Sequence, residues 1–114
     1  MTIYSKSIPI FLLTLLAATI TSEAKAFSAR HDKVANIFKS KAEPTAKDAL
    51  WTDPKIFKVG VIDNGSNRNG YAEYVCEVLM DEGFRGEKVW VQVIDIAKLI
   101  NTKKWVTIGE AHCR

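Results

Sequence analysis

The sequence is poor in the residues and motifs that most often identify an enzyme. It has two cysteines and two histidines among 114 residues, with neither a C-x-x-C pair nor a histidine-rich cluster. Such spacings would indicate a metal or redox site. It also lacks the G-x-x-x-x-G-K-[ST] and G-x-G-x-x-G motifs that make phosphate binding specific. We therefore expect no metal and no cofactor, and we favour a non-enzymatic role.

The charge of the chain lacks a dominant sign. It has 16 Lys and Arg against 13 Asp and Glu, a formal net charge of +3 at pH 7. Domains that bind nucleic acid usually concentrate a strong basic excess on one face. The balance indicates neither nucleic acid nor a strongly acidic surface as the partner.

The first 26 residues have the features of an export signal. Lys6 gives a modestly positive start, and residues 8–20 form an apolar run too short to span a membrane comfortably. The segment ends in the A-x-A pattern of residues 24–26. We predict cleavage after Ala26 and a periplasmic or secreted protein with no stable membrane anchor. The alternative is that the segment stays attached as an anchor.

Both cysteines, Cys76 and Cys113, follow the predicted cleavage point. An even number of cysteines in a small exported domain predicts a disulfide. By restricting the unfolded chain, a bridge across so long a loop would contribute roughly 3–4 kcal/mol. The hydrophobic core of a domain this small contributes a similar free energy to its stability. The alternative, a redox-active or metal-binding pair, lacks the usual spacing.

Residues 58–84 predict a strand, a turn and an amphipathic helix. The uncharged, β-branched segment 59–62 is typical of a buried strand. Nearly every residue in 63–70 is a turn former. Over 71–82 the apolar residues recur at helical spacing, with acidic residues on the opposite side. Gly83 suits the left-handed position that ends a helix.

A second strand is predicted over residues 88–95, where valines alternate with other residues. Two strands joined through a helix favour parallel pairing with a right-handed crossover. A helical turn over 96–101, capped by Asp95, and a third strand over 105–108 complete the elements. The remaining tail would bring Cys113 to the helix.

The domain organisation follows from these elements. Residues 55–114 are predicted to form a small α/β domain: a βαβ unit with one amphipathic helix on a three-stranded mixed sheet, stapled by the disulfide. Residues 27–54, rich in Lys, Ala and Thr, predict a flexible N-terminal arm. A short helix there could place Val34, Ile37 and Phe38 on one face. We interpret the arm as a solvated terminus, with a partner-binding arm as the alternative.

Both predicted parallel strands end in the letters V-I-D, at Asp63 and Asp95. The carboxyl edge of an open α/β sheet is where ligands bind. Two carboxylates there could hold a divalent cation or divide acid and base roles. The simpler interpretation, which we favour, is that each aspartate caps the turn or helix that follows it.

Two weaker candidate sites remain. Arg68, Asn69 and Gly70 precede a helix N-terminus, where an anion could bind. A catalytic triad can be drawn from Ser66, His112 and either aspartate, because the disulfide pulls His112 toward the helix. No nucleophile-elbow sequence surrounds Ser66.

The functional hypothesis is an exported accessory protein that acts by protein–protein contact in the cell envelope, on an envelope or extracellular protein. The alternative is a small hydrolase, or a ligand- or cation-binding module, using the strand ends at Asp63 and Asp95. The sequence also has three tryptophans, Trp51, Trp90 and Trp105. Core filling is their default role, and an exposed one would mark a partner surface.

Overall fold

The computed structural model describes residues 27–114, so the predicted signal segment lies outside the described residues. The elements follow one another as α2 (Ala29–Lys39), β1 (Ala46–Asp53), β2 (Ile56–Val61), α3 (Asn69–Leu79), the π-helical turn η3 (Met80–Phe84), β3 (Trp90–Asp95), α4 (Ile96–Thr102) and β4 (Thr107–His112).

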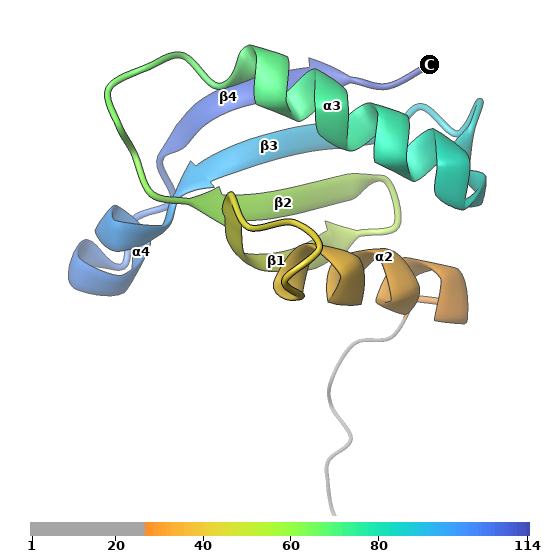
Figure 1. Cartoon of the computed structure of the whole chain (residues 1–114), viewed down its shortest axis with the longest axis horizontal. Coiled ribbons are helices and arrows are strands. Elements are labelled where there is room, and N and C mark those ends of the chain that lie inside the picture. The colour runs from red at the N-terminus through yellow and green to blue at the C-terminus, as the bar shows by residue number, and fades with distance from the viewer. Residues whose placement is uncertain (1–26) are drawn as a thin grey trace, which may run out of the picture.

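The strands form a four-stranded sheet in the order β1-β2-β3-β4 (Figure 1). β2 and β3 are parallel, as predicted, and α3 lies in the crossover between them. The edge strands β1 and β4 are antiparallel to their neighbours. The predicted small α/β fold with a mixed sheet is confirmed. The additional strand, β1, comes from the region predicted to be an arm.

Helices α2 and α3 lie on the same side of the sheet, α2 over β1 and α3 over β3 and β4 (Figure 1). Strand residues alternate between the two faces. Phe57, Val59 and Val61 of β2 therefore point to the helices, as do Val91 and Val93 of β3, and all have 0 % exposure. The core lies between the sheet and these two helices.

Residues 27–54 do not form the flexible arm predicted from the sequence. They supply α2 and β1, and both elements contribute to the core. Val34 and Phe38 of the helix have 0 % exposure, which confirms the predicted apolar face of a short helix. Ala49 and Trp51 of β1 are also buried. Their apolar contacts with β2 offset the conformational entropy lost when the segment becomes ordered.

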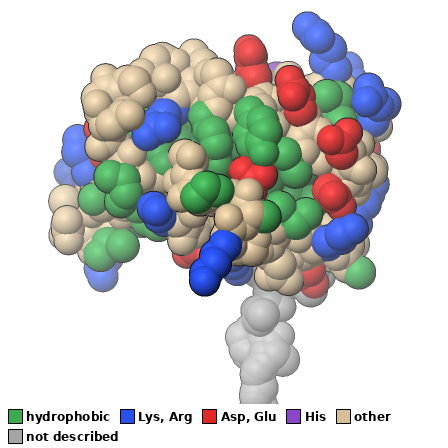
Figure 2. Space-filling model, in the orientation of Figure 1, with side chains coloured by type: hydrophobic (Ala, Val, Ile, Leu, Met, Phe, Trp, Pro, Cys, Tyr) green, Lys and Arg blue, Asp and Glu red, His purple; other side chains and the backbone are tan. Residues whose placement is uncertain are grey.

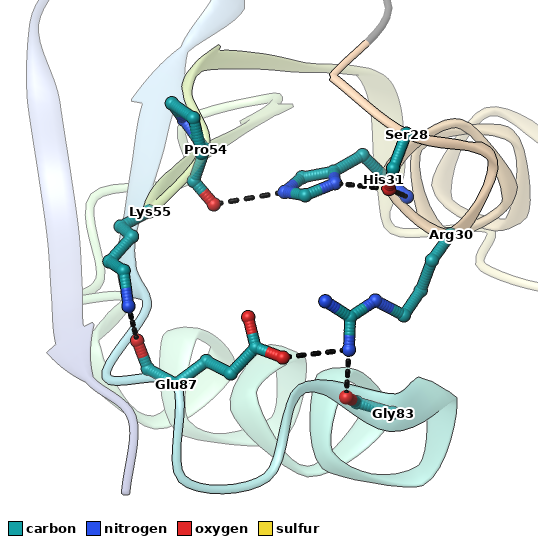
Figure 3. A network of polar contacts seen from close by, with 7 residues as sticks. All are labelled: Ser28, Arg30, His31, Pro54, Lys55, Gly83 and Glu87. Atoms are coloured by element: carbon teal, nitrogen blue, oxygen red, sulfur yellow. Dashed lines mark hydrogen bonds and ion pairs between the residues drawn. The ribbon is translucent and has the colours of Figure 1, made fainter.

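The start of α2 is fixed by the buried imidazole of His31 (Figure 3). Its Nε2 lies 3.0 Å from the carbonyl oxygen of Pro54, and its Nδ1 lies 2.6 Å from the hydroxyl oxygen of Ser28. Because a carbonyl oxygen can only accept, Nε2 donates to Pro54, and in the neutral imidazole Nδ1 then accepts from the serine hydroxyl. The ring packs edge-on against Trp51 and Phe84. Both nitrogens are thus used in holding the helix to the sheet.

A second set of contacts joins α2 to the segment after α3 (Figure 3). The Arg30 guanidinium donates to the carbonyl of Gly83 and forms an ion pair of 2.7 Å with Glu87. The hydrogen bond from Arg30 to the Glu87 carboxylate lowers the pKa of that carboxyl group. The Lys55 ammonium donates to the Glu87 carbonyl at 2.9 Å. Exposed contacts of this kind are individually weak, so their main effect is to orient the helix.

The central helix is shorter than the predicted 71–82. α3 ends at Leu79 and continues into η3, where Gly83 has the left-handed φ of +100° that the sequence predicted. The predicted C-terminal tail forms most of β4. Figure 2 shows a line of acidic side chains over α3. The exposed acidic residues of α3 and η3 include Glu73, Glu77 and Asp81, so the predicted polar side faces outward.

A disulfide and backbone contacts near the start of the helix hold α3 to β4. The predicted disulfide is confirmed, with Cys76 and Cys113 joined and their Cα atoms 5.3 Å apart. Such bonds are typical of oxidising, non-cytosolic compartments. Near the start of the helix, the Arg68 amide donates to the Ile108 carbonyl at 3.0 Å. A Cβ on Gly109 would lie 2.3 Å from the Arg68 carbonyl carbon, so this close approach requires glycine.

Candidate functional site

The two strand-end aspartates serve as local caps. Asp63 is exposed, and its Oδ1 accepts from the Gly65 amide at 2.9 Å. Asp95 is 3 % exposed, and its Oδ1 accepts from the Lys98 amide at 3.1 Å, which caps α4. Within residues 27–114, no group of three or more His, Cys, Asp or Glu side chains could hold a metal ion. The geometry supports the capping interpretation of both residues.

The structure does not assemble the candidate triad. His112 pairs with Trp90 at the start of β3, and the two rings stack with centroids 5.3 Å apart. Asp95 ends the same strand, five residues and therefore roughly 17 Å away. Ser66 is exposed, and its hydroxyl donates to the Asn64 side chain at 2.6 Å. Because β4 runs antiparallel to β3, His112 lies at the opposite end of β3 from Asp95.

The candidate anion-binding residues are used mainly inside the protein. The Arg68 guanidinium donates to the Ile62 carbonyl at 2.9 Å. The Asn69 side-chain oxygen accepts from the Glu110 amide at 2.9 Å. Gly70 is exposed and offers only its backbone. Arg68 and Asn69 thus hold the loop before α3 and the edge of β4.

Two tyrosines near the start of α3 have raised pKa values. Burial, with the nearby Glu43 carboxylate, raises the pKa of Tyr71, whose hydroxyl has no hydrogen-bond partner among the described residues. The Tyr74 hydroxyl donates to Glu43 at 2.6 Å, and this bond raises its pKa. Both phenols stay protonated near neutral pH, so neither is suited to act as a base there.

The face of the sheet opposite α2 and α3 is not covered by those helices. In the described part of the chain, α4 and Trp105 pack at one end of it. We call the remainder the open face. Its residues are Leu50, Ile56, Lys58, Trp90, Gln92, Glu110 and His112.

Contacts across the strands order the open face. Leu50, Lys58, Gln92 and Glu110 occupy opposed positions on successive strands and form one row. The Lys58 ammonium donates to the Gln92 side-chain oxygen. From the adjacent row, the Trp90 indole donates to the Glu110 carboxylate of this row at 2.9 Å. These bonds fix the positions of long side chains on the surface of the sheet.

A small apolar pocket lies where α4 meets the open face. Its volume is about 30 Å³, and Asp48 and Lys58 contribute one charge of each sign to its lining. We call it the α4 pocket. Its apolar lining residues are Ala49, Leu50, Gly60, Ile94, Ile96, Leu99 and Trp105. Sequence reasoning had singled out Trp105, but not the other lining residues, which come from four different elements.

The edge of β4 is partly occupied by the start of α3. The carbonyl of Ile108 accepts from Arg68, and the amide of Glu110 donates to the Asn69 side chain. An incoming strand would need these same groups. This edge is therefore poorly available for adding a strand from another protein.

On the other edge strand, β1, a backbone amide is likewise already hydrogen-bonded within the protein. The Ala49 amide donates to the side chain of the preceding residue, Asp48, at 2.8 Å. That amide is engaged and is not offered to a new strand. Both edges thus have some of their backbone groups occupied, whereas the open face is broad and ordered.

Comparison of the chain with protein-family models, curated protein sequences and solved structures found no match. Within residues 27–114, no helix has the length and apolar character to cross a bilayer.

Proposed function

We propose that this protein is an exported, non-enzymatic accessory protein that binds another protein of the cell envelope or exterior through its open face. The observation that carries the proposal is the pre-ordered row of side chains on that face, with Trp90 beside it. Export is supported by the predicted signal segment and by the Cys76–Cys113 bond, which suits an oxidising compartment.

The ordering of the open face favours protein contact. Binding immobilises side chains at a cost of about 0.5–1.5 kcal/mol each. Lys58 and Gln92 are already joined to each other, as are Trp90 and Glu110, which lowers that cost. Tryptophan is also enriched among the residues that dominate binding energy.

The alternative function at Asp63 and Asp95 has less support. A cation or a proton-transfer role needs carboxylate oxygens directed to a shared site. Here one oxygen of each aspartate accepts a local backbone amide, and neither residue lines the α4 pocket. The contact function therefore accounts for more of the geometry.

The export part of the proposal is tested by intact mass spectrometry of the protein made in its own cells. We expect a periplasmic or extracellular chain that begins at Phe27. A chain that still begins at Met1, found in the cytosol or membrane, would contradict export.

The contact part is tested by photo-crosslinking in the same cells. A photoreactive phenylalanine analogue replaces Leu50 or Glu110 on the open face, or Asn36 on the exposed side of α2 as the control. We expect an adduct with one protein from Leu50 and Glu110, and none from Asn36. No adduct from the open face, or equal adducts from all three positions, would overturn the proposal.

A further inference from the structure

We propose that the α4 pocket is the anchor point of the open face, and that it takes one short aliphatic side chain from an extended segment of the partner protein. This inference rests on the proposed function, because it assumes that the open face binds a protein. It specifies the part of the partner that enters the pocket. That part is an aliphatic side chain between alanine and valine in size, with its peptide backbone lying beside the pocket.

The size of the pocket sets the size of its occupant. Its volume is about 30 Å³. A cavity needs at least about 10–15 Å³ to hold one water, whereas a cavity that binds benzene measures about 150 Å³. The α4 pocket is therefore large enough to take a methyl or isopropyl group and too small to enclose an aromatic ring.

The apolar lining favours a hydrocarbon group over a polar one. Ile94 is 2 % exposed at the base, and Ile96 and Leu99 of α4 form one wall. A polar group placed against these apolar residues would lose its hydrogen bonds to water and gain none from them. An aliphatic side chain loses nothing of the kind and buries its own surface.

The two charged lining residues match a peptide backbone. Asp48 uses its Oδ1 for the Ala49 amide, and Lys58 donates to Gln92. The carboxylate and the ammonium each retain further hydrogen-bonding capacity. One acceptor and one donor of opposite charge suit the N–H and C=O of a neutral peptide group better than a ligand with a net charge.

Large apolar side chains around the pocket are exposed to solvent, as expected for a binding surface without its partner. Leu50 is 39 % exposed, Trp105 is 50 % exposed and Ile100 of α4 is 68 % exposed. Energetically dominant contacts are typically an aromatic residue and a filled pocket, ringed by side chains that exclude water. Trp105 and the α4 pocket supply the first two, and Leu50 and Ile100 can supply part of the ring.

A single methyl group can block the pocket from its wall. The Cβ of Gly60→Ala would lie 2.8 Å from Cδ1 and 3.2 Å from Cβ of Ile96, so the Ile96 side chain must turn and the start of α4 must move by a few tenths of an ångström. Gly70→Ala is the matched control, because nothing lies within 4 Å of its Cβ. Leu99→Phe is a second blocking variant, placed on α4, a helix with no fully buried residue.

The first measurement uses xenon as the probe on the purified exported protein, followed by amide NMR shifts. We expect saturable shifts at the residues that line the pocket in the wild type and in Gly70→Ala. The shifts should be lost in Gly60→Ala and Leu99→Phe. A wild-type protein with no localised shift, or blocked variants that shift like wild type, would overturn the aliphatic pocket.

The second measurement repeats the in-cell crosslinking from Glu110, which lies outside the pocket, in the folded variants. We expect the yield to fall about tenfold in Gly60→Ala and Leu99→Phe, the scale of a dominant contact, and to be unchanged in Gly70→Ala. Unchanged yields in both blocking variants would overturn the anchor and leave the proposed function standing. No adduct even in wild type would overturn both. An adduct between two copies of this chain would replace the partner protein with a second copy.

Discussion

The two faces of the sheet use alternate residues of the same strands for different purposes. On β2, Phe57 and Val59 are buried under the helices, whereas Lys58 between them lies on the open face and donates to Gln92. One face supplies the apolar burial on which folding depends. The other is held flat by polar contacts and leaves large side chains accessible. If the open face binds a protein as proposed, stability and binding can be changed separately in this fold, and four predictions test this.

The largest contrast is expected between a core residue and an open-face residue. Phe38→Ala removes a ring with 0 % exposure from α2 and should lower the free energy of unfolding by about 3–5 kcal/mol. Leu50→Ala, at 39 % exposure, should cost about 1 kcal/mol or less. Urea denaturation measures both. Equal losses would show that the faces are not distinct, and a silent Phe38→Ala would restore the flexible arm.

The next effect concerns the disulfide that fixes α3 over the covered face. Cys76→Ser and Cys113→Ser each remove the same bond and should destabilise the protein by a similar amount, about 3–4 kcal/mol. The double variant should be little worse than either single variant. Two titratable thiols in the native wild-type protein would refute the bond itself.

A smaller effect is expected where α3 approaches β4. Gly109→Ala places a methyl 2.3 Å from the Arg68 carbonyl carbon and should cost about 1–3 kcal/mol. Gly70→Ala meets nothing within 4 Å and lies in α3, so it should be neutral or stabilising by up to about 1 kcal/mol. Melting temperatures compare the two. A Gly109→Ala protein as stable as Gly70→Ala would show that the close approach is not required.

The smallest effect is expected at the strand ends. Asp63→Asn and Asp95→Asn should fold, change stability by less than about 1 kcal/mol and keep the crosslinks, because asparagine caps about as well as aspartate. A metal or acid–base role would not tolerate the amide. A folded Asp63→Asn protein that had lost all biological activity would favour site chemistry over contact through the open face.

Several elements could be predicted because their signals are local. The helical spacing of apolar residues identified α3, and Gly83 has the predicted left-handed conformation, although it lies in η3 beyond the end of α3. The turn capped by Asp95 is α4, which the structure extends by one residue. Cys76 and Cys113 are the only cysteines, so their pairing had one solution. In each case a few neighbouring residues, or a count, were sufficient.

Strand β1 was missed because its local pattern is weak. Of its eight residues, Ala46, Ala49 and Trp51 are buried, and the rest are exposed. Neither strict alternation nor a run of β-branched residues marks it. It is a strand because β2 lies beside it, and its buried residues fill the space under α2.

The sequence by itself determined the periodic elements, the covalent bridge and the capping chemistry at the strand ends, since these depend on residues close in the chain or on composition. The tertiary structure decided which of the chemically interesting side chains meet. Antiparallel pairing of β4 placed His112 beside Trp90 and away from Asp95, and sheet register aligned the row of the open face. The α4 pocket arose in the same way, because long-range pairing brings distant segments together and local sequence patterns do not record it.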